Sequence, residues 1–134
     1  MSVSSVRPAT TDRDRKPTVI DQTHLERMTL GDRRLEREVL ELFVRQTTIL
    51  LGRIVGVDQA LAAAAAHTLK GSARGVGAWR VARAAELVES AATGEAAASA
   101  MEEAVTELKS ASLEASAAIG TRLSGLMAET ARER

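Results

Sequence analysis

Residues 58–94 read DQALAAAAAHTLKGSARGVGAWRVARAAELVESAATG, and this stretch decides the fold. Its first half is an alanine-rich run from Gln59 to about Ala73, and alanine is the strongest helix former. Gly75 and Gly77 interrupt this run, and a second amphipathic pattern follows from about Ala78 to Ala92. The stretch therefore predicts two helices joined by a tight glycine turn.

Similar patterns flank this stretch on both sides. Apolar residues recur at helical spacing from Arg33 to about Ile54 and again from Glu95 to about Ile119. A shorter helix is expected to begin at Asp21 or Thr23, either of which can cap it, and to end near Leu30. Helices joined by short turns pack as antiparallel neighbours. We therefore predict an all-α fold, an up-and-down antiparallel four-helix bundle with a short additional N-terminal helix.

The rest of the chain divides into one domain and two ends. Residues 1–18 are polar and charged and contain both prolines, so we expect a disordered N-terminal arm. The bundle domain is expected over residues 19–120, with Asp32 and Asp58 as the caps of its second and third helices. Residues 121–134 are expected to form a polar C-terminal tail.

The composition excludes several classes of function. Lysine plus arginine and aspartate plus glutamate number 18 each, so the chain has no general attraction for nucleic acid or for an anionic membrane. The absence of cysteine excludes disulfides and thiolate metal sites. No apolar run approaches the roughly 20 residues that a membrane-spanning helix needs. We therefore expect a soluble, cytoplasmic protein.

Three residues of the first alanine-rich helix carry a chemical signal. His67 precedes Lys70 by three positions and Gly71 by four, so all three lie on one helical face. An imidazole can act as a nucleophile near neutral pH, and a lysine ammonium can pair with a phosphate. A glycine inside a helix costs about 0.5–1 kcal/mol relative to alanine, and access to the histidine is a reason to have it. This face fits a histidine that accepts a phosphoryl group from one protein and gives it to another.

The run His67–Ala73 (HTLKGSA), followed by Val76–Ala78 (VGA), resembles the histidine-containing phosphotransfer (HPt) domain of bacterial two-component phosphorelays. The resemblance extends over about residues 20–119. It implies that His67 is the phosphoryl acceptor, that Lys70 neighbours the phosphate and that Gly71 provides steric access. It also implies a residue that orients the imidazole. Glu89, 22 positions after the histidine, matches that place, and Glu86 one turn away is the alternative.

The same resemblance implies the partners. These would be response-regulator receiver domains and a hybrid histidine kinase, with transfer from one receiver aspartate to another through the histidine. Magnesium is expected on the receiver domain, and no cofactor is expected on this chain. Because no phosphate-binding glycine loop follows a predicted strand, we expect no ATP binding and no kinase activity of its own. We also expect a monomer without nucleic-acid or membrane partners. The residues expected to contact the partner are Ala63, Ala64, Arg74, Arg80 and Arg83.

Two other functions are compatible with the sequence. A helical bundle can serve as a scaffold or inhibitor of a signalling protein without using its histidine. The helix, glycine turn and arginine-bearing second helix also resemble a helix-turn-helix loosely, although the near-zero net charge disfavours DNA binding. A metal site is not expected, because His24 and His67 lack the spacing of metal ligands. His24 is expected to be a solvent-exposed residue.

Overall fold

The computed structural model describes residues 18–56, 58–94 and 98–132, and all regular secondary structure in these ranges is helical. The all-helical prediction is therefore confirmed. None of the described helices is long and apolar enough to cross a membrane. The helices are α2 (Gln22–Met28), α3 (Arg33–Ile54), α4 (Gln59–Val76), α5 (Trp79–Thr93) and α6 (Ala98–Arg132).

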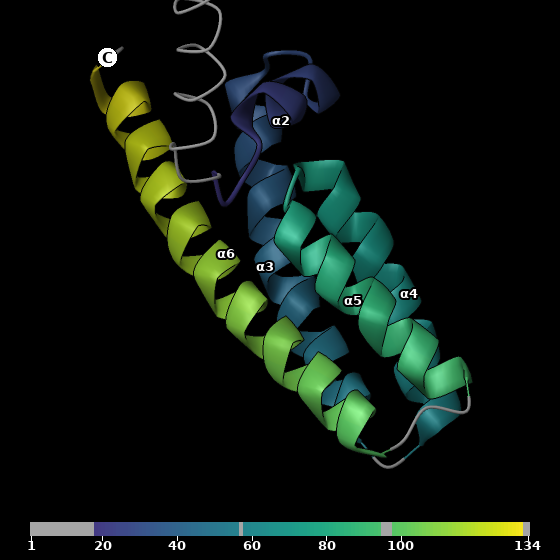
Figure 1. Cartoon of the computed structure of the whole chain (residues 1–134). Helices are drawn as coiled ribbons and strands as arrows, with labels where there is room; N and C mark the ends of the chain where they lie inside the picture. Colours follow the sequence, from purple (N-terminus) through teal and green to yellow (C-terminus); the bar gives the residue numbers. More distant parts are fainter. Residues whose placement is uncertain (1–17, 57, 95–97, 133–134) are drawn as a thin grey trace, which may run out of the picture.

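The four long helices lie alongside one another and α2 packs at one end of them (Figure 1). Each long helix contacts the next one in the chain, and α6 returns to contact α3. The short helix α2 contacts α4 at the end where α4 stops and α5 begins. The site-bearing helix α4 is thus held between α3 on one side and α5 on the other.

Aspartates begin three of the helices, as the sequence predicts. The carboxylates of Asp32 and Asp58 each accept hydrogen bonds from two backbone N–H groups in the first turn of α3 and α4. Asp21, rather than the alternative Thr23, caps α2 by accepting from the His24 N–H at 3.1 Å. These caps satisfy N–H groups that have no partner inside their own helix.

The helix α4 is longer than predicted. It was expected to end near Ala73 because two glycines follow, but it continues through Gly75 to Val76. Val76 is buried, so one more turn of helix adds an apolar side chain to the core. Gly77 ends the helix at φ +80°, and its carbonyl accepts the Asp21 backbone N–H at 2.9 Å. The turn glycine therefore also ties α2 to the start of α5.

The helix α6 is also longer than predicted, which corrects its expected end near Ile119. It runs to Arg132, so residues 121–132 of the expected polar tail are helical. Gly120 and Gly125 lie inside this helix. Ile119 and Leu126, two turns apart, are both buried, and this packing outweighs the low helix propensity of two glycines. The expected start at Glu95 and the expected disorder of residues 1–17 fall outside the described residues.

A buried carboxylate joins α2, α3 and α6. Glu36 is 1% exposed and accepts hydrogen bonds from Arg122 of α6 at 2.6 and 3.1 Å, from Gln22 of α2 at 3.1 Å and from Arg33 at 3.2 Å. Burial favours the protonated form of Glu36, but the hydrogen bonds from Arg122, Gln22 and Arg33 outweigh it and hold its pKa below the ordinary value. Glu36 therefore stays ionised, and removal of Arg122 would leave a buried charge without its main partner.

Small side chains fill the contact between α4 and α5. The buried residues of these helices are mostly alanines, and alanine lets two helix axes approach closely. The buried alanines of the two helices are Ala62, Ala65, Ala66, Ala73, Ala82, Ala84 and Ala85.

The end of α4 generates a prediction for two neighbouring glycines. A Cβ on Gly77 would lie 3.0 Å from the Cβ and the carbonyl oxygen of Asp21, in a left-handed backbone conformation. Gly77→Ala is therefore expected to lower the free energy of unfolding by about 1–2 kcal/mol or more. A Cβ on Gly75 would meet nothing within 4 Å, so Gly75→Ala is expected to raise it by about 0.5–1 kcal/mol. Urea unfolding of both variants tests this, and equal effects would contradict the assigned geometry.

Candidate functional site

The candidate site is centred on His67 in the middle of α4. Its side chain is 68% exposed, although Ala66, directly before it, and Leu69, two positions after it, are fully buried. On the same face of the helix, Ala63 is half-buried and Ala64 is exposed, and both side chains are short. The imidazole therefore projects into solvent, and the side chains of Ala63 and Ala64 beside it are short.

Glu89 of α5 reaches across to this histidine. Its Oε2 atom lies 2.9 Å from His67 Nδ1, and its Oε1 atom accepts a hydrogen bond from Lys70 Nζ at 2.8 Å. Glu86, the alternative orienting residue, lies instead beside Arg74, with 4.0 Å between their charged groups. A single carboxylate thus contacts both His67 and Lys70 of α4. We name His67, Lys70 and Glu89 the triad.

The charge of Glu89 is held by its neighbours. The hydrogen bond from Lys70 is the main cause that lowers the pKa of Glu89 below its ordinary value, and the contact with His67 adds to this effect. Partial burial acts in the opposite direction and is outweighed. Glu89 is therefore an ionised carboxylate at neutral pH.

The ionised carboxylate determines which imidazole nitrogen carries the proton. A carboxylate can only accept hydrogen bonds, so His67 must donate its Nδ1–H to Glu89. In the neutral imidazole, the other nitrogen, Nε2, then has an unshared electron pair. This arrangement can perform nucleophilic attack through Nε2 with the ring held in place from behind.

Gly71 and Ala64 leave one side of the histidine open. On the helix surface they lie on the opposite side of His67 from Lys70. A Cβ on Gly71 would meet nothing within 4 Å, so none of the residues that the structure describes fills the space that this glycine leaves. The arrangement offers a reactive partner a path to Nε2 that does not cross the triad.

The sequence predicts that Lys70 neighbours the phosphate. In the structure, Lys70 instead contacts Glu89. Its side chain is only 16% exposed, and its ammonium group bonds the carboxylate. Sequence reasoning predicts the helical face of this lysine correctly, because the face depends on spacing alone. It does not predict the ammonium's contact, because that depends on how closely α5 approaches.

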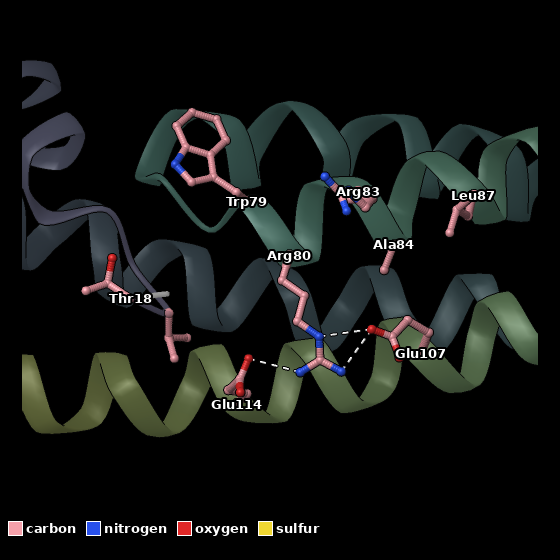
Figure 2. Close-up of a pocket in the computed structure, with 9 residues that line it drawn as sticks. Thr18, Trp79, Arg80, Arg83, Ala84, Leu87, Glu107 and Glu114 are labelled. Atoms are coloured by element: carbon pink, nitrogen blue, oxygen red, sulfur yellow. Dashed lines mark hydrogen bonds and ion pairs between the residues drawn. The ribbon is translucent and has the colours of Figure 1, made fainter. Parts of the chain in front are cut away.

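The two arginines of α5 expected to contact a partner lie away from the triad, toward α6. Arg80 donates hydrogen bonds to Glu107 at 2.9 Å and to Glu114 at 3.0 Å, so its charge is matched within the chain. Figure 2 shows Arg80 between these two carboxylates, in a groove that Arg83 and Trp79 also line. Arg74 of α4 is the expected arginine that shares a helical face with His67.

Sequence reasoning missed a second polar group at the end of α4. His24 Nε2 lies 2.8 Å from the carbonyl oxygen of Arg74, and the His24 ring packs on Trp79 with 4.9 Å between centroids. Trp79 in turn donates its indole N–H to Asp21 at 3.0 Å. His24 is therefore not the free surface residue that we expected. Asp21 and His24 lie 50 to 58 positions before Arg74 and Trp79 where they meet, and no local spacing indicates these contacts.

Within the three described ranges, no group of three or more histidine, aspartate or glutamate side chains is arranged to hold a metal ion. The polar groups of α4 and α5 are instead arranged around one nucleophilic nitrogen.

Comparison with known proteins supplies the family. The family model of the Hpt domain matches residues 38–128, which is more than half of the chain and includes His67, Lys70, Gly71 and Glu89. No curated protein and no solved structure matches the chain. Hpt domains carry phosphoryl groups in two-component signalling and are not themselves the enzymes of the pathway. This chain belongs to the Hpt-domain family.

Proposed function

We propose that this protein is a histidine phosphotransfer protein of a multistep phosphorelay. It takes a phosphoryl group from the aspartate of one receiver domain onto His67 and passes it to the aspartate of another. The observation that carries the proposal is the 2.9 Å contact between His67 Nδ1 and the ionised Glu89, which gives the neutral imidazole its free electron pair on Nε2, in an exposed side chain.

The transfer step follows from this geometry. The electron pair of Nε2 attacks the phosphorus atom of the receiver's phosphoaspartate, a P–N bond forms, and the P–O bond to the aspartate breaks. The aspartate leaves as a carboxylate, and the imidazole gains positive charge while Nδ1 keeps its proton. Glu89 stabilises this charge through the hydrogen bond it already accepts. Transfer is reversible, because the phosphohistidine and the phosphoaspartate are both reactive linkages.

Lys70 has a second task in this proposal. Its ammonium neutralises Glu89 in the free protein, and it lies one helical turn from His67. A phosphoryl group on Nε2 carries a charge on the order of −2 and attracts a nearby cation. The long side chain of Lys70 can follow that charge while Glu89 keeps its bond to the histidine.

The docking surface for the receiver is proposed around the open side of His67. Ala63, Ala64 and Gly71 provide the low surface, and Arg74 provides positive charge at its edge. Arg83 is a peripheral contact at most, because it lines the groove between α5 and α6. Arg80 joins α5 to α6 in this proposal and does not bind the partner.

The remaining parts of the proposal follow from the family and from the arrangement of the helices. The helices α3 to α6 form an up-and-down antiparallel bundle, the protein is cytoplasmic, and a hybrid histidine kinase supplies the phosphoryl group through its receiver domain. The protein binds no ATP and does not phosphorylate itself. All three residues of the triad come from one chain, so one copy suffices for transfer.

Phosphoryl transfer from a panel of phosphorylated receiver domains tests the proposal directly. The parent is expected to acquire a label that is labile in acid and stable in alkali, and His67→Gln is expected to acquire none. His24→Gln is the matched control, because it removes the only other histidine and keeps the nucleophile. If no receiver labels the folded parent, a scaffold that does not use its histidine becomes the better interpretation.

Gly71 tests whether access to His67 limits transfer. Gly71→Leu is expected to slow transfer about a hundredfold, because it keeps the attacking and accepting atoms apart. The free protein should keep its stability, since the added side chain meets open space. Gly120→Leu in α6 is the control, because that glycine is also helical with nothing within 4 Å of an added Cβ. Equal transfer rates in the two variants would contradict an access role for Gly71.

A substitution of Lys70 tests both its role in transfer and its contact with Glu89. Lys70→Ala is expected to slow transfer about tenfold through loss of a charge-assisted hydrogen bond to the phosphoryl group. Because Lys70 is the main cause of the lowered pKa of Glu89, the same variant should move the titration of the Glu89 carboxyl to higher pH. Carboxyl carbon chemical shifts followed by NMR measure this. An unchanged Glu89 titration would contradict the assigned contact, whatever the transfer rate.

A further inference from the structure

The outer face of α3 carries three exposed apolar side chains in a row. Leu35 is 37% exposed, Leu42 is 45% exposed and Ile49 is 56% exposed. They are spaced by seven residues, so they follow one another along two-turn intervals on one side of the helix. We name these three residues the α3 stripe. It extends over about 21 Å of helix.

The residues of the α3 stripe are not the ones by which α3 contributes to the core. The buried apolar residues of this helix are Leu40, Phe43, Leu50 and Ile54, which pack against the other helices. Each stripe side chain is partly covered within its own chain, and the part that stays exposed is apolar surface available to a partner. The stripe's repeat of seven is the pattern by which one helix packs along another.

Two charges of opposite sign flank the α3 stripe on the same side. Glu38 follows Leu35 by three positions, Arg45 follows Leu42 by three positions, and both are exposed. The ion pairs that α3 makes in the described part of the chain come from Arg33 and Glu36. Seven residues separate Glu38 from Arg45, which is too far for them to pair along one helix.

We propose that a second copy of this chain covers the α3 stripe, with the two α3 helices antiparallel. Leu42 lies midway between Leu35 and Ile49, so a two-fold axis through Leu42 places Leu35 of one copy against Ile49 of the other. The same axis places Glu38 of each copy opposite position 46 of the other copy, next to Arg45. The stripe is thus complementary to itself in apolar packing and in charge, as a two-fold interface requires.

The dimer departs from the monomer expected from the sequence, and its test is separate from that of the proposed phosphotransfer, although Leu42 also lines a groove with Ser72 and Gly75 of α4. The triad comes from α4 and α5, and no residue of the α3 stripe belongs to it. The dimer therefore presents two phosphotransfer sites. A contact along one short helix face buries less area than a permanent interface, so the dimer is reversible and forms with rising concentration.

Sedimentation velocity over a range of protein concentration tests the apolar part of the interface. The parent is expected to shift from monomer to dimer as its concentration rises. Leu42→Asp should weaken this association at least about tenfold, because it places a charge at the centre of the seam. Leu113→Asp is the matched control, since Leu113 is an exposed leucine of α6, and it should associate as the parent does. Circular dichroism verifies that both variants fold.

Charge reversal tests the antiparallel register. Glu38→Arg alone and Arg45→Glu alone each place like charges opposite one another twice, so each variant is expected to associate about tenfold more weakly than the parent. The double variant restores both pairs and should recover the parent's association. An equimolar mixture of the two single variants should form a heterodimer, because each then supplies the charge that the other lacks.

Three outcomes would overturn the proposal. The first is a parent that stays monomeric at every concentration. The second is a parent dimer that survives Leu42→Asp. The third is a pair of single charge variants that fail to associate when mixed. If the parent is monomeric and Leu42→Asp abolishes receiver binding, then the receiver domain occupies the α3 stripe and the dimer is excluded.

Discussion

The close approach of α4 and α5 is the constraint on which the site depends. Alanines such as Ala66 and Ala85 are fully buried between these helices, and larger side chains there would push the helix axes apart. This close packing lets a glutamate on α5 reach the imidazole of His67, 22 residues earlier in the chain. The many alanines therefore do more than favour helix, because they set the distance across which the triad forms.

The carboxylate of Glu89 binds Lys70 and also orients the imidazole of His67. Its two oxygen atoms face different partners: one accepts from Lys70 and the other contacts His67 Nδ1. The lysine lowers the pKa of this carboxylate, and the carboxylate accepts the hydrogen bond that Nδ1–H of His67 donates. The lysine and the histidine are thus linked through one carboxylate.

Polar contacts at the end of the bundle where α2 packs join α2 and α3 to α6, and join α2 to the turn between α4 and α5. Glu36 joins α2 and α3 to Arg122 of α6, and Asp21 joins α2 to the turn at Gly77 and to Trp79. Local signals predicted the caps, because an aspartate before a helix acts on its own first turn. They did not predict the length of α6. Burial of Leu126 and the pairing of Arg122 keep this helix intact beyond two glycines that suggest an end.

The sequence by itself determined which segments form helices, though not where α4 and α6 end. It also determined where aspartates begin the helices and that His67, Lys70 and Gly71 share one face. These features depend on propensity and on the period of 3.6 residues, which act within a few positions. Tertiary structure decided that Glu89 rather than Glu86 contacts the histidine, that Lys70 pairs with that glutamate, and that Arg80 is held by α6. Each of these contacts joins two helices. It depends on their rotation and separation, which only the packing of the whole bundle sets.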